Sequence, residues 1–321
     1  MSVLSRLRRQ LFSADVNDEI CLIRQYYRLE LTRKKAPILI ISCLDSRISS
    51  VGFADRLRGM VSCYAYAKAI NVPFRIEHVA PFDLSEYLVP NLYDWTLKSG
   101  EKDYNLLYSD PIVFMQHTIE QHSLKLFRIS KKRQHHLYTN ASYLKDINSR
   151  YHTNYSFLEL YQELFKPSSF LEDLLETHLK QLHSCGGYIS ISFRFMQLMG
   201  DFKDCGGETL SEGDKLDLLQ RSLSIIKGLQ EKHQKTVFVT SDSQTFLNEA
   251  SKLTNVYIAP GTIGHIGFSK ERGIYDKMFT DFYLISQADH VYMAHSGKMY
   301  RSNFAKMAAS TSGAQYDEIS Y

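Results

Sequence analysis

The sequence lacks the features that mark several classes of protein. Its longest apolar stretch, Ala36 to Leu44, is far shorter than the roughly 20 residues that cross a bilayer. Five cysteines cannot all pair, and no two form a Cys-x-x-Cys motif, so neither a disulfide framework nor a zinc site is indicated. The first residues lack the apolar run and cleavage site of a signal peptide. We therefore expect a cytoplasmic protein whose cysteines are mostly buried thiols.

Several catalytic motifs are missing as well. The sequence contains no Gly-x-x-x-x-Gly-Lys-Ser/Thr phosphate loop, no Gly-x-Ser-x-Gly nucleophile turn and no His-Glu-x-x-His metal motif. It also contains no Asp-x-Asp, a common means of holding a divalent ion against a diphosphate. We therefore expect neither a bound metal nor a resident cofactor.

The overall charge is close to balance. The net charge of +3 is too small to indicate a nucleic-acid partner, and 321 residues with 44% hydrophobic and 23% charged side chains suggest two globular domains. Basic residues are concentrated at the start, where Arg6, Arg8 and Arg9 stand beside apolar residues at helical spacing. This helix either packs on its own domain or lies on an anionic membrane, which would place the protein at the inner membrane face.

The apolar periodicity predicts a β/α alternation. In the first half it predicts a buried strand at 37–42, a helix at 53–69 and a strand at 73–78, followed by a short helix at 83–88. The segment from 91 to 150 has no clear pattern, and we interpret its basic run at 131–133, with the two histidines that follow, as a solvated loop.

The second half is more regular. The predicted helices span 156–182 with a break at Pro167, 214–232, 243–253, 278–287 and 302–309, and the predicted strands span 188–193, 236–240, 256–259 and 290–294. Such an alternation implies a parallel sheet with helices on both faces. We divide the chain into domains at 1–170 and 171–321. In two doubly wound domains, ligands are expected at the carboxyl ends of the strands.

Five segments at predicted strand ends carry candidate site residues. Gly52 to Gly59 places a turn before a helix that carries Arg56 and Arg58, and both helix N-termini and arginines favour anions. Arg194 ends a strand, where its guanidinium can hold a phosphate through two hydrogen bonds. In each case the alternative is an ordinary loop, helix cap or surface arginine.

The remaining segments are rich in small polar residues. Thr240, Ser241 and Asp242 follow a strand and can either grip a nucleoside or cap the next helix. The glycine-rich stretch 261–267 lacks the spacing of a dinucleotide fingerprint but contains His265. The stretch 295–304 joins a strand to a helix whose first amides could receive a phosphate. Its candidate residues are Ser296, Gly297, Ser302, Asn303 and Phe304.

The order of these segments resembles that of the GDP-fucose-dependent fucosyltransferase superfamily, which includes α-1,2-, α-1,6- and protein O-fucosyltransferases. Residues 52–59 are similar to its first glycine loop, 188–194 with Gly200-Asp201 to its His-x-Arg-x-Gly-Asp motif, and 237–242 to its Val-x-x-Thr-Asp strand. Residues 288–305 are similar to its C-terminal donor-binding motif. The chain departs from this pattern at Ser192, where the family has histidine, and at Asp55, where it has asparagine. An insertion also separates Arg194 from Gly200.

The resemblance implies a GT-B-like fold of two Rossmann-like domains that face each other across a cleft. It implies an inverting, metal-independent transfer of fucose from GDP-fucose to a hydroxyl of a glycan, as in polysaccharide biosynthesis. Domain 1–170 would bind the acceptor and domain 171–321 the nucleotide sugar. Arg194 would stabilise the departing diphosphate, Asp45 or Asp55 would take the proton, and the other candidate residues above would bind the donor.

Two alternatives stay open. The departures at Ser192 and Asp55 would also suit a GT-B transferase that uses another nucleotide sugar. A catalytically silent sugar-binding protein of the same fold is the other alternative. We further expect aromatic residues of the first domain to stack on the acceptor sugar, namely Tyr64, Tyr66, Phe82 and Tyr87.

Overall fold

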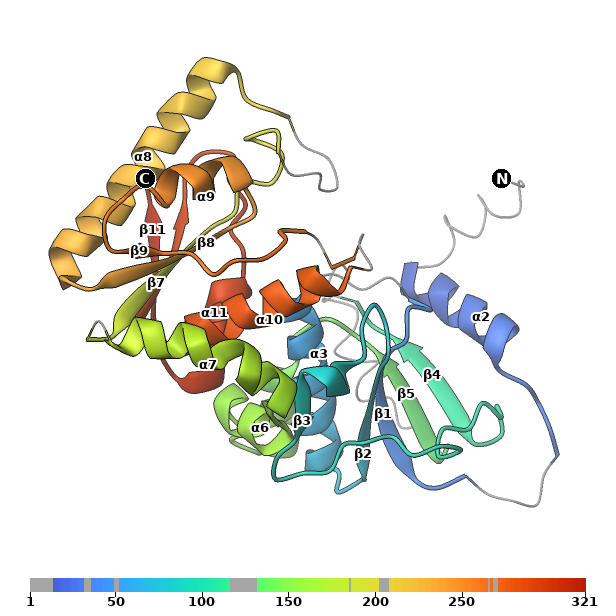
Figure 1. Ribbon diagram of the computed structural model, residues 1–321. Coiled ribbons are helices and arrows are strands. Elements are labelled where there is room, and N and C mark those ends of the chain that lie inside the picture. Colours follow the sequence, from blue (N-terminus) through green and yellow to red (C-terminus); the bar gives the residue numbers. More distant parts are fainter. Residues whose placement is uncertain are drawn as a thin grey trace. The chain divides into compact units, whose positions relative to one another are not determined.

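Two units, each built on a parallel sheet, organise the chain (Figure 1). The computed structural model describes residues 14–31, 36–48, 52–115, 132–184, 186–201, 208–264, 266–267 and 271–321. Unit 1 comprises Met1–Leu84 and Val89–Lys166, and unit 2 comprises Ser85–Leu88 and Pro167–Tyr321. The division therefore falls at Pro167 rather than at residue 171, and a short piece of the first half belongs to the second unit. The predicted N-terminal helix at residues 3–11 lies outside the described residues.

The sheet of unit 1 has the strand order β2-β1-β5-β4, with all neighbours parallel. Its strands are β1 (Leu39–Leu44), β2 (Phe74–His78), β4 (Ser109–Val113) and β5 (Gln134–Tyr138). Its helices are α2 (Ala14–Tyr26), α3 (Phe53–Ala69), α5 (Leu144–Tyr151) and α6 (Phe157–Leu164), and the 3-10 turn η1 (Leu84–Glu86) lies where the chain passes into unit 2. The predicted strand–helix–strand opening is confirmed, and the predicted helix at 83–88 shortens to η1.

The two faces of this sheet are covered by different helices. Leu22 of α2 packs with Leu39, Ile41 and Cys43, which alternate along β1 and so share one face. Helix α3 covers the neighbouring strands β1 and β2 from the other face, where the Tyr64 ring lies 5.4 Å from that of Phe74. Both faces of β1 are therefore buried, as its unbroken apolar run predicts.

Strand β5 corrects the interpretation of the basic run. The residues after Arg133 form an inner strand in which His136 is fully buried, although this stretch was expected to be a solvated loop. The His136 ring is accommodated because Tyr27 Oη lies 2.5 Å from its Nδ1 and Gln134 Oε1 lies 3.0 Å from its Nε2. Burial also keeps the pKa of His136 well below its ordinary value. From the sequence alone, a histidine that is buried with hydrogen-bond partners on both ring nitrogens cannot be distinguished from one in a polar loop.

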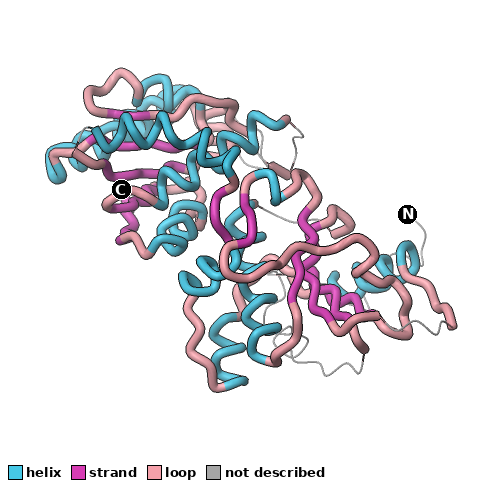
Figure 2. The backbone as a smooth tube through the Cα atoms, turned by 60° about the horizontal axis from the view of Figure 1, so that its bottom comes forward, coloured by secondary structure: helices cyan, strands magenta, loops and turns pink. Residues whose placement is uncertain are grey.

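The sheet of unit 2 has the order β11-β10-β7-β8-β9 and is also parallel. Its strands are β7 (Tyr188–Phe193), β8 (Thr236–Ser241), β9 (Val256–Tyr257), β10 (His290–His295) and β11 (Gln315–Ser320). Its helices are α7 (Ser169–Ser184), α8 (Glu212–His233), α9 (Gln244–Ala250), α10 (Arg272–Ser286) and α11 (Phe304–Ser312). Helices α8 and α9 lie on one face and α7, α10 and α11 on the other (Figure 1), and Figure 2 shows the magenta strands with cyan helices around them. The predicted β/α alternation of this half is confirmed.

The strands β3 (Leu88–Pro90) and β6 (Phe165–Pro167) pair in a small sheet where the chain passes between units. Within unit 2, the ring of Tyr87 stacks on that of Phe279 at a centroid distance of 4.2 Å, and its hydroxyl donates to Asp276 at 2.6 Å. The segment 85–88 is thus a packed part of unit 2. No helix of the described residues is long and apolar enough to cross a membrane.

Candidate functional site

The carboxyl ends of β7, β8 and β10 bring the main candidates of unit 2 to one edge of its sheet. Arg194 directly follows β7, and its Nε lies 3.2 Å from Asp242 Oδ2 at the end of β8. The Asp242 carboxylate also accepts hydrogen bonds of 2.8 Å from the backbone N–H groups of Phe195 and Met196. Asp242 therefore fixes the direction in which the Arg194 guanidinium points.

The surroundings of Asp242 have opposite effects on the pKa of its carboxyl. Burial raises the pKa of its carboxyl, while the Arg194 cation and the two backbone N–H groups act to lower that pKa. The ion pair is nearly enclosed, since 3% of the Asp242 side chain and 23% of the Arg194 side chain are exposed. A carboxylate with these partners is a positioning group for Arg194, which differs from the nucleoside-gripping role expected from the sequence.

The hydroxyl residues beside Asp242 bind one another. Thr240 Oγ1 lies 2.7 Å from Ser192 Oγ, the position at which the resembled family has histidine, and both residues are buried. Ser241 Oγ accepts from the N–H of Ser243, which caps α9. Asp201 completes this cap, because its Oδ2 accepts from Ser243 Oγ at 2.9 Å and from the N–H of Thr245 at 2.6 Å. These side chains shape the end of β8 more than they offer groups to a ligand.

A turn follows β10 and runs beside Arg194. The register pairs Phe193 with Ala294, so Arg194 and His295 are adjacent across the two strands. The N–H of Tyr300 donates to the Arg194 carbonyl at 3.0 Å, which ties this turn to the end of β7. Gly297 has a φ of +50°, in the region that favours glycine. The predicted link between a strand and a helix at 295–304 is therefore present, and the structure places it beside Arg194.

The residues of this turn differ in solvent exposure. Ser296 is buried, whereas Asn303, the N-cap residue of α11, is exposed and makes no side-chain cap. The N–H of Phe304 donates to Ser302 Oγ at 3.2 Å, and the Phe304 ring packs edge-on against that of Phe282. The Phe304 side chain thus anchors the helix in the unit 2 core. An anion at this end would meet Asn303 and the first turn of α11.

One residue at this edge was not found from the sequence. Arg221 of α8 donates from Nη1 to Ser296 Oγ at 3.0 Å and from Nε to Asp217 Oδ2 at 2.9 Å. In sequence, Arg221 and Asp217 form an ordinary i,i+4 ion pair on a helix surface. Nothing in the spacing signals that the arginine reaches the end of a strand 75 residues further on.

The candidates of unit 1 lie at the start of α3. Gly52 is the N-cap residue of this helix, and Asp55 and Arg58 form an ion pair on its first turn. Burial raises the pKa of Asp55, while the Arg58 cation acts to lower it. Arg56 was expected to bind the donor; the structure places it where it is 3% exposed and donates to the Ala80 carbonyl at 3.0 Å, and its donor-binding role stays a prediction.

Arg56 also influences the neighbouring His78. Burial lowers the pKa of His78 to about 3, and the positive charge of Arg56 adds to this effect. His78 is buried, and its Nδ1 lies 3.1 Å from the Phe82 carbonyl oxygen. In this contact Nδ1 donates to the carbonyl, which acts to raise the pKa, so the neutral state of the ring follows from burial and from the Arg56 charge.

Asp45 lies after β1 in a nearly closed cluster of charges. Its Oδ2 lies 3.3 Å from Arg47 Nη1, 3.4 Å from Lys102 Nζ and 3.1 Å from the Tyr138 hydroxyl that donates to it. Lys102 also pairs with Glu77, and only 5% of the Asp45 side chain is exposed. Two cations and a hydroxyl therefore surround this carboxylate inside the protein.

The aromatic residues expected to stack on a sugar are core residues. Tyr64, Tyr66, Phe82 and Tyr87 are all at most 8% exposed, so the expectation is wrong for each of them. Their rings pack on neighbouring aromatic rings because buried tyrosines contribute apolar area while the hydroxyl finds a polar partner, as Tyr64 does with Glu163 at 2.7 Å. His265 lies outside the described residues.

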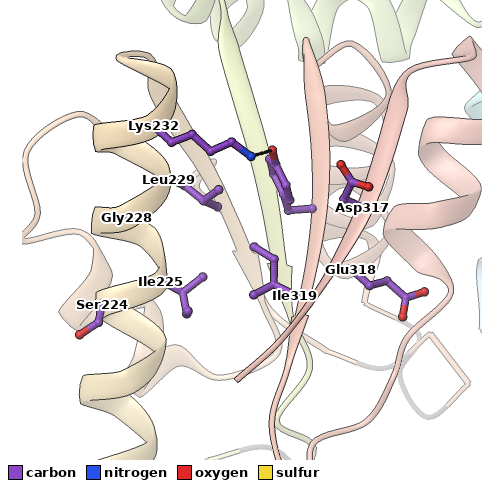
Figure 3. A pocket seen from close by; sticks show the side chains of 9 residues that line it. Ser224, Ile225, Gly228, Leu229, Lys232, Asp317, Glu318 and Ile319 are labelled. Atoms are coloured by element: carbon purple, nitrogen blue, oxygen red, sulfur yellow. Dashed lines mark hydrogen bonds between the residues drawn. The ribbon is translucent and has the colours of Figure 1, made fainter.

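A separate groove of about 460 Å³ lies between α8 and the strands β10 and β11 (Figure 3). Ile225, Leu229 and Ile319 are apolar lining residues and Lys232 brings a charge to the groove, whereas the Glu318 carboxylate points away from α8 and pairs with Arg301. The Lys232 ammonium lies 3.4 Å from the hydroxyl of Tyr292 in the middle of β10. The groove therefore differs in position from the polar edge at Arg194. Within the described residues, no cluster of three His, Cys, Asp or Glu side chains could hold a metal ion.

Solved structures resemble 86–98% of this chain. One is an arginine-to-lysine mutant of FUT1 from Arabidopsis thaliana in complex with GDP, with a TM-score of 0.59 and 13% identity over 98% of this chain and 78% of that one. The chain has the fold of these fucosyltransferases. NodZ, an α-1,6-fucosyltransferase soaked with GDP-fucose, gives a TM-score of 0.55 and 15% identity over 86% of this chain and 92% of that one. Fucosyltransferase NodZ from Bradyrhizobium gives a TM-score of 0.53 and 14% identity over 86% of this chain and 93% of that one.

The likeness confirms the predicted fold class of two Rossmann-like units, each with a parallel sheet. No protein-family model matches the sequence. No curated protein matches it either. At identities of 13–15%, the similarity lies in the fold, and the chemistry has to be argued from the residues of this chain.

Proposed function

We propose that this chain is an inverting glycosyltransferase that transfers fucose from GDP-fucose to a hydroxyl group of a glycan or polysaccharide. The observation that carries the proposal is Arg194, held by Asp242 at the carboxyl edge of a parallel sheet and tied to the turn that follows β10. This edge is where doubly wound sheets bind ligands. The fold is shared with fucosyltransferases that were solved with GDP or GDP-fucose, which supports a GDP-sugar as the donor.

The reaction requires the chain to stabilise a growing negative charge. An acceptor oxygen forms a bond to the anomeric carbon from one side while the bond to the β-phosphate oxygen breaks on the other, and the electron pair of the broken bond stays on the departing GDP. Arg194 would offset this charge through a guanidinium that is already oriented, so little energy is spent on reorganisation during the reaction. The exposed N-terminal end of α11 at Asn303 would bind the same diphosphate.

The acceptor hydroxyl must lose its proton. Of the two carboxylates expected from the sequence, Asp55 is the better base, because burial raises its pKa and a quarter of its side chain is exposed. Asp45 is enclosed by Arg47, Lys102 and Tyr138 and is better suited to holding the end of β1.

Calorimetry with GDP and UDP tests the donor class. Binding of GDP in preference to UDP supports the proposal, and a mixture of glycans incubated with GDP-fucose then identifies an acceptor through a fucosylated product. Preferential binding of UDP would instead assign another nucleotide sugar as the donor. This outcome is tested because the chain has Ser192, hydrogen-bonded to Thr240, where the resembled family has histidine. Binding of neither nucleotide would contradict the proposal and favour a silent protein of the same fold.

A further inference from the structure

Arg221 stands out as a second arginine at the polar edge of unit 2. Its Nη1 donates to Ser296 Oγ at 3.0 Å, and Ser296 is the first residue after β10. The neighbouring strand ends at Arg194, which is adjacent to His295 across the sheet. The Arg221 guanidinium therefore reaches this turn directly, while Arg194 contacts the turn through its backbone carbonyl and directs its guanidinium to Asp242 after β8.

The position of Arg221 is fixed by the packing around it. The next residue, Ser222, is buried and shares a short hydrogen bond with the Tyr321 hydroxyl. Tyr321 in turn donates its N–H to the His295 carbonyl at 3.2 Å and places its ring 5.9 Å from the Arg221 guanidinium. Helix α8 is thus fastened to the end of β10 directly beside Ser296.

A surface ion pair does not account for this arrangement. The Asp217 partner is 64% exposed, and pairs of that kind contribute little to stability. A guanidinium has five N–H groups in a planar fork, of which Asp217 and Ser296 take one each. About half of the Arg221 side chain is exposed, so the guanidinium can contact a bound molecule.

We propose that Arg221 is a second cation for the diphosphate of the nucleotide donor, binding it together with Arg194. The inference rests on the proposed function for the presence of a diphosphate, but it does not depend on the base or on the sugar. As the bond to the anomeric carbon breaks, its electron pair stays on the β-phosphate oxygen. Two arginines then neutralise charge that many enzymes offset with a divalent ion.

The test compares nucleoside diphosphate with nucleoside monophosphate binding. The wild-type protein should bind GDP more tightly than GMP, and Arg221→Ala should weaken GDP binding about tenfold or more while changing GMP binding much less. Arg221→Gln retains a donor for Ser296 but lacks the charge, so it should behave like the alanine variant. Lys252→Ala removes an exposed cation at the far end of α9 and should leave both affinities unchanged.

The outcomes separate this inference from the proposed function. If the protein prefers uridine nucleotides, the ratio of diphosphate to monophosphate affinity is measured with UDP and UMP instead. An error in the assigned nucleobase therefore leaves the role of Arg221 intact. A normal diphosphate preference in Arg221→Ala would overturn the inference while leaving the donor assignment standing. Full activity in Arg221→Gln would instead make Arg221 a positioning residue for Ser296. Binding of no nucleoside diphosphate by the wild-type protein would overturn both.

Discussion

Arg194 is the residue on which the proposed chemistry depends most. Arg194→Ala should reduce kcat by about 10²–10³, as removal of one oriented donor to a developing charge does elsewhere. Arg194→Lys should also be poor, because an ammonium can neither bind in two-pronged fashion nor keep the planar contact with Asp242. Steady-state rates and a melting curve on both variants check this. A lysine variant with near-normal rates would show that the assigned role is wrong.

The two carboxylates of unit 1 should respond differently to the same substitution. Asp55→Asn should lower kcat with little change in melting temperature, because it removes the proposed base from a partly exposed position. Asp45→Asn should instead lower the melting temperature, because Arg47 and Lys102 lose an anionic partner inside a nearly closed cluster. Normal turnover in Asp55→Asn at saturating donor and acceptor would exclude Asp55 as the base.

His78 should make unit 1 sensitive to acid. Its pKa is about 3 when folded, and an unfolded histidine has a pKa near its ordinary 6.5, so only the unfolded chain gains this proton as the pH falls below 6.5. The sign is therefore a loss of stability between pH 6.5 and 3, of about 2 kcal/mol by pH 5. Arg56 disfavours the protonated ring and Asp83 favours it, and the burial effect is the largest of the three.

Melting temperatures at pH 7 and pH 5 measure this effect. His78→Gln should show a smaller drop than the wild-type protein, and the exposed His183→Gln should show the same drop. Some pH dependence should remain in His78→Gln, because burial also lowers the pKa of His136. Equal drops in all three proteins would contradict a neutral, buried His78.

At the level of elements, two helical glycines offer a matched comparison. A Cβ at Gly59 in α3 would overlap the carbonyl oxygen of Thr139, whereas a Cβ at Gly228 in α8 would meet open space. Gly59→Ala should therefore force α3 away from the end of β5 and cost about 1–3 kcal/mol. Gly228→Ala should stabilise its helix by up to about 1 kcal/mol. Opposite shifts in melting temperature are expected, and a tolerated Gly59→Ala would show that α3 packs less closely than described.

The elements found from sequence are those with strong apolar patterns. Strand β1 follows an apolar run, strand β7 follows an alternating pattern, and helices α3 and α8 follow helical periodicity, so local sequence patterns specify them. Strand β4 was missed because it contains Pro111, which is tolerated at the sheet edge that β4 occupies. Strand β11, also at an edge, is mostly exposed and has no apolar run to detect.

The candidate site was also only partly predictable from the sequence. Arg194 could be predicted because it directly follows a strand, and position along the chain then determines position at the sheet edge. The contacts of Asp242 with Arg194 and two backbone N–H groups could not be predicted, since they arise only when neighbouring strands align, and its role toward a nucleoside stays a prediction. Arg221 could not be found at all, because its contact depends on how far a long side chain extends from a helix.

For the whole molecule, the proposed chemistry should need no metal. Arg194, the start of α11 and the proposed contact of Arg221 supply positive charge and amides to the diphosphate, so transfer should proceed in EDTA at the untreated rate. Fucosyl transfer measured with EDTA and then with added manganese or magnesium checks this. Activity that disappears in EDTA and returns with manganese would contradict the proposal.

The segment 85–88 limits how this protein can be divided. The chain enters unit 2 at Ser85, returns to unit 1 at Val89 and enters unit 2 again at Pro167, so no single cut yields two complete units. A fragment that begins at Pro167 would lack the Tyr87 ring that stacks on Phe279 and the hydroxyl that binds Asp276. Gene fusions that exchange unit 2 between related proteins would therefore have to carry this four-residue segment with it, or supply an equivalent tyrosine from the new partner.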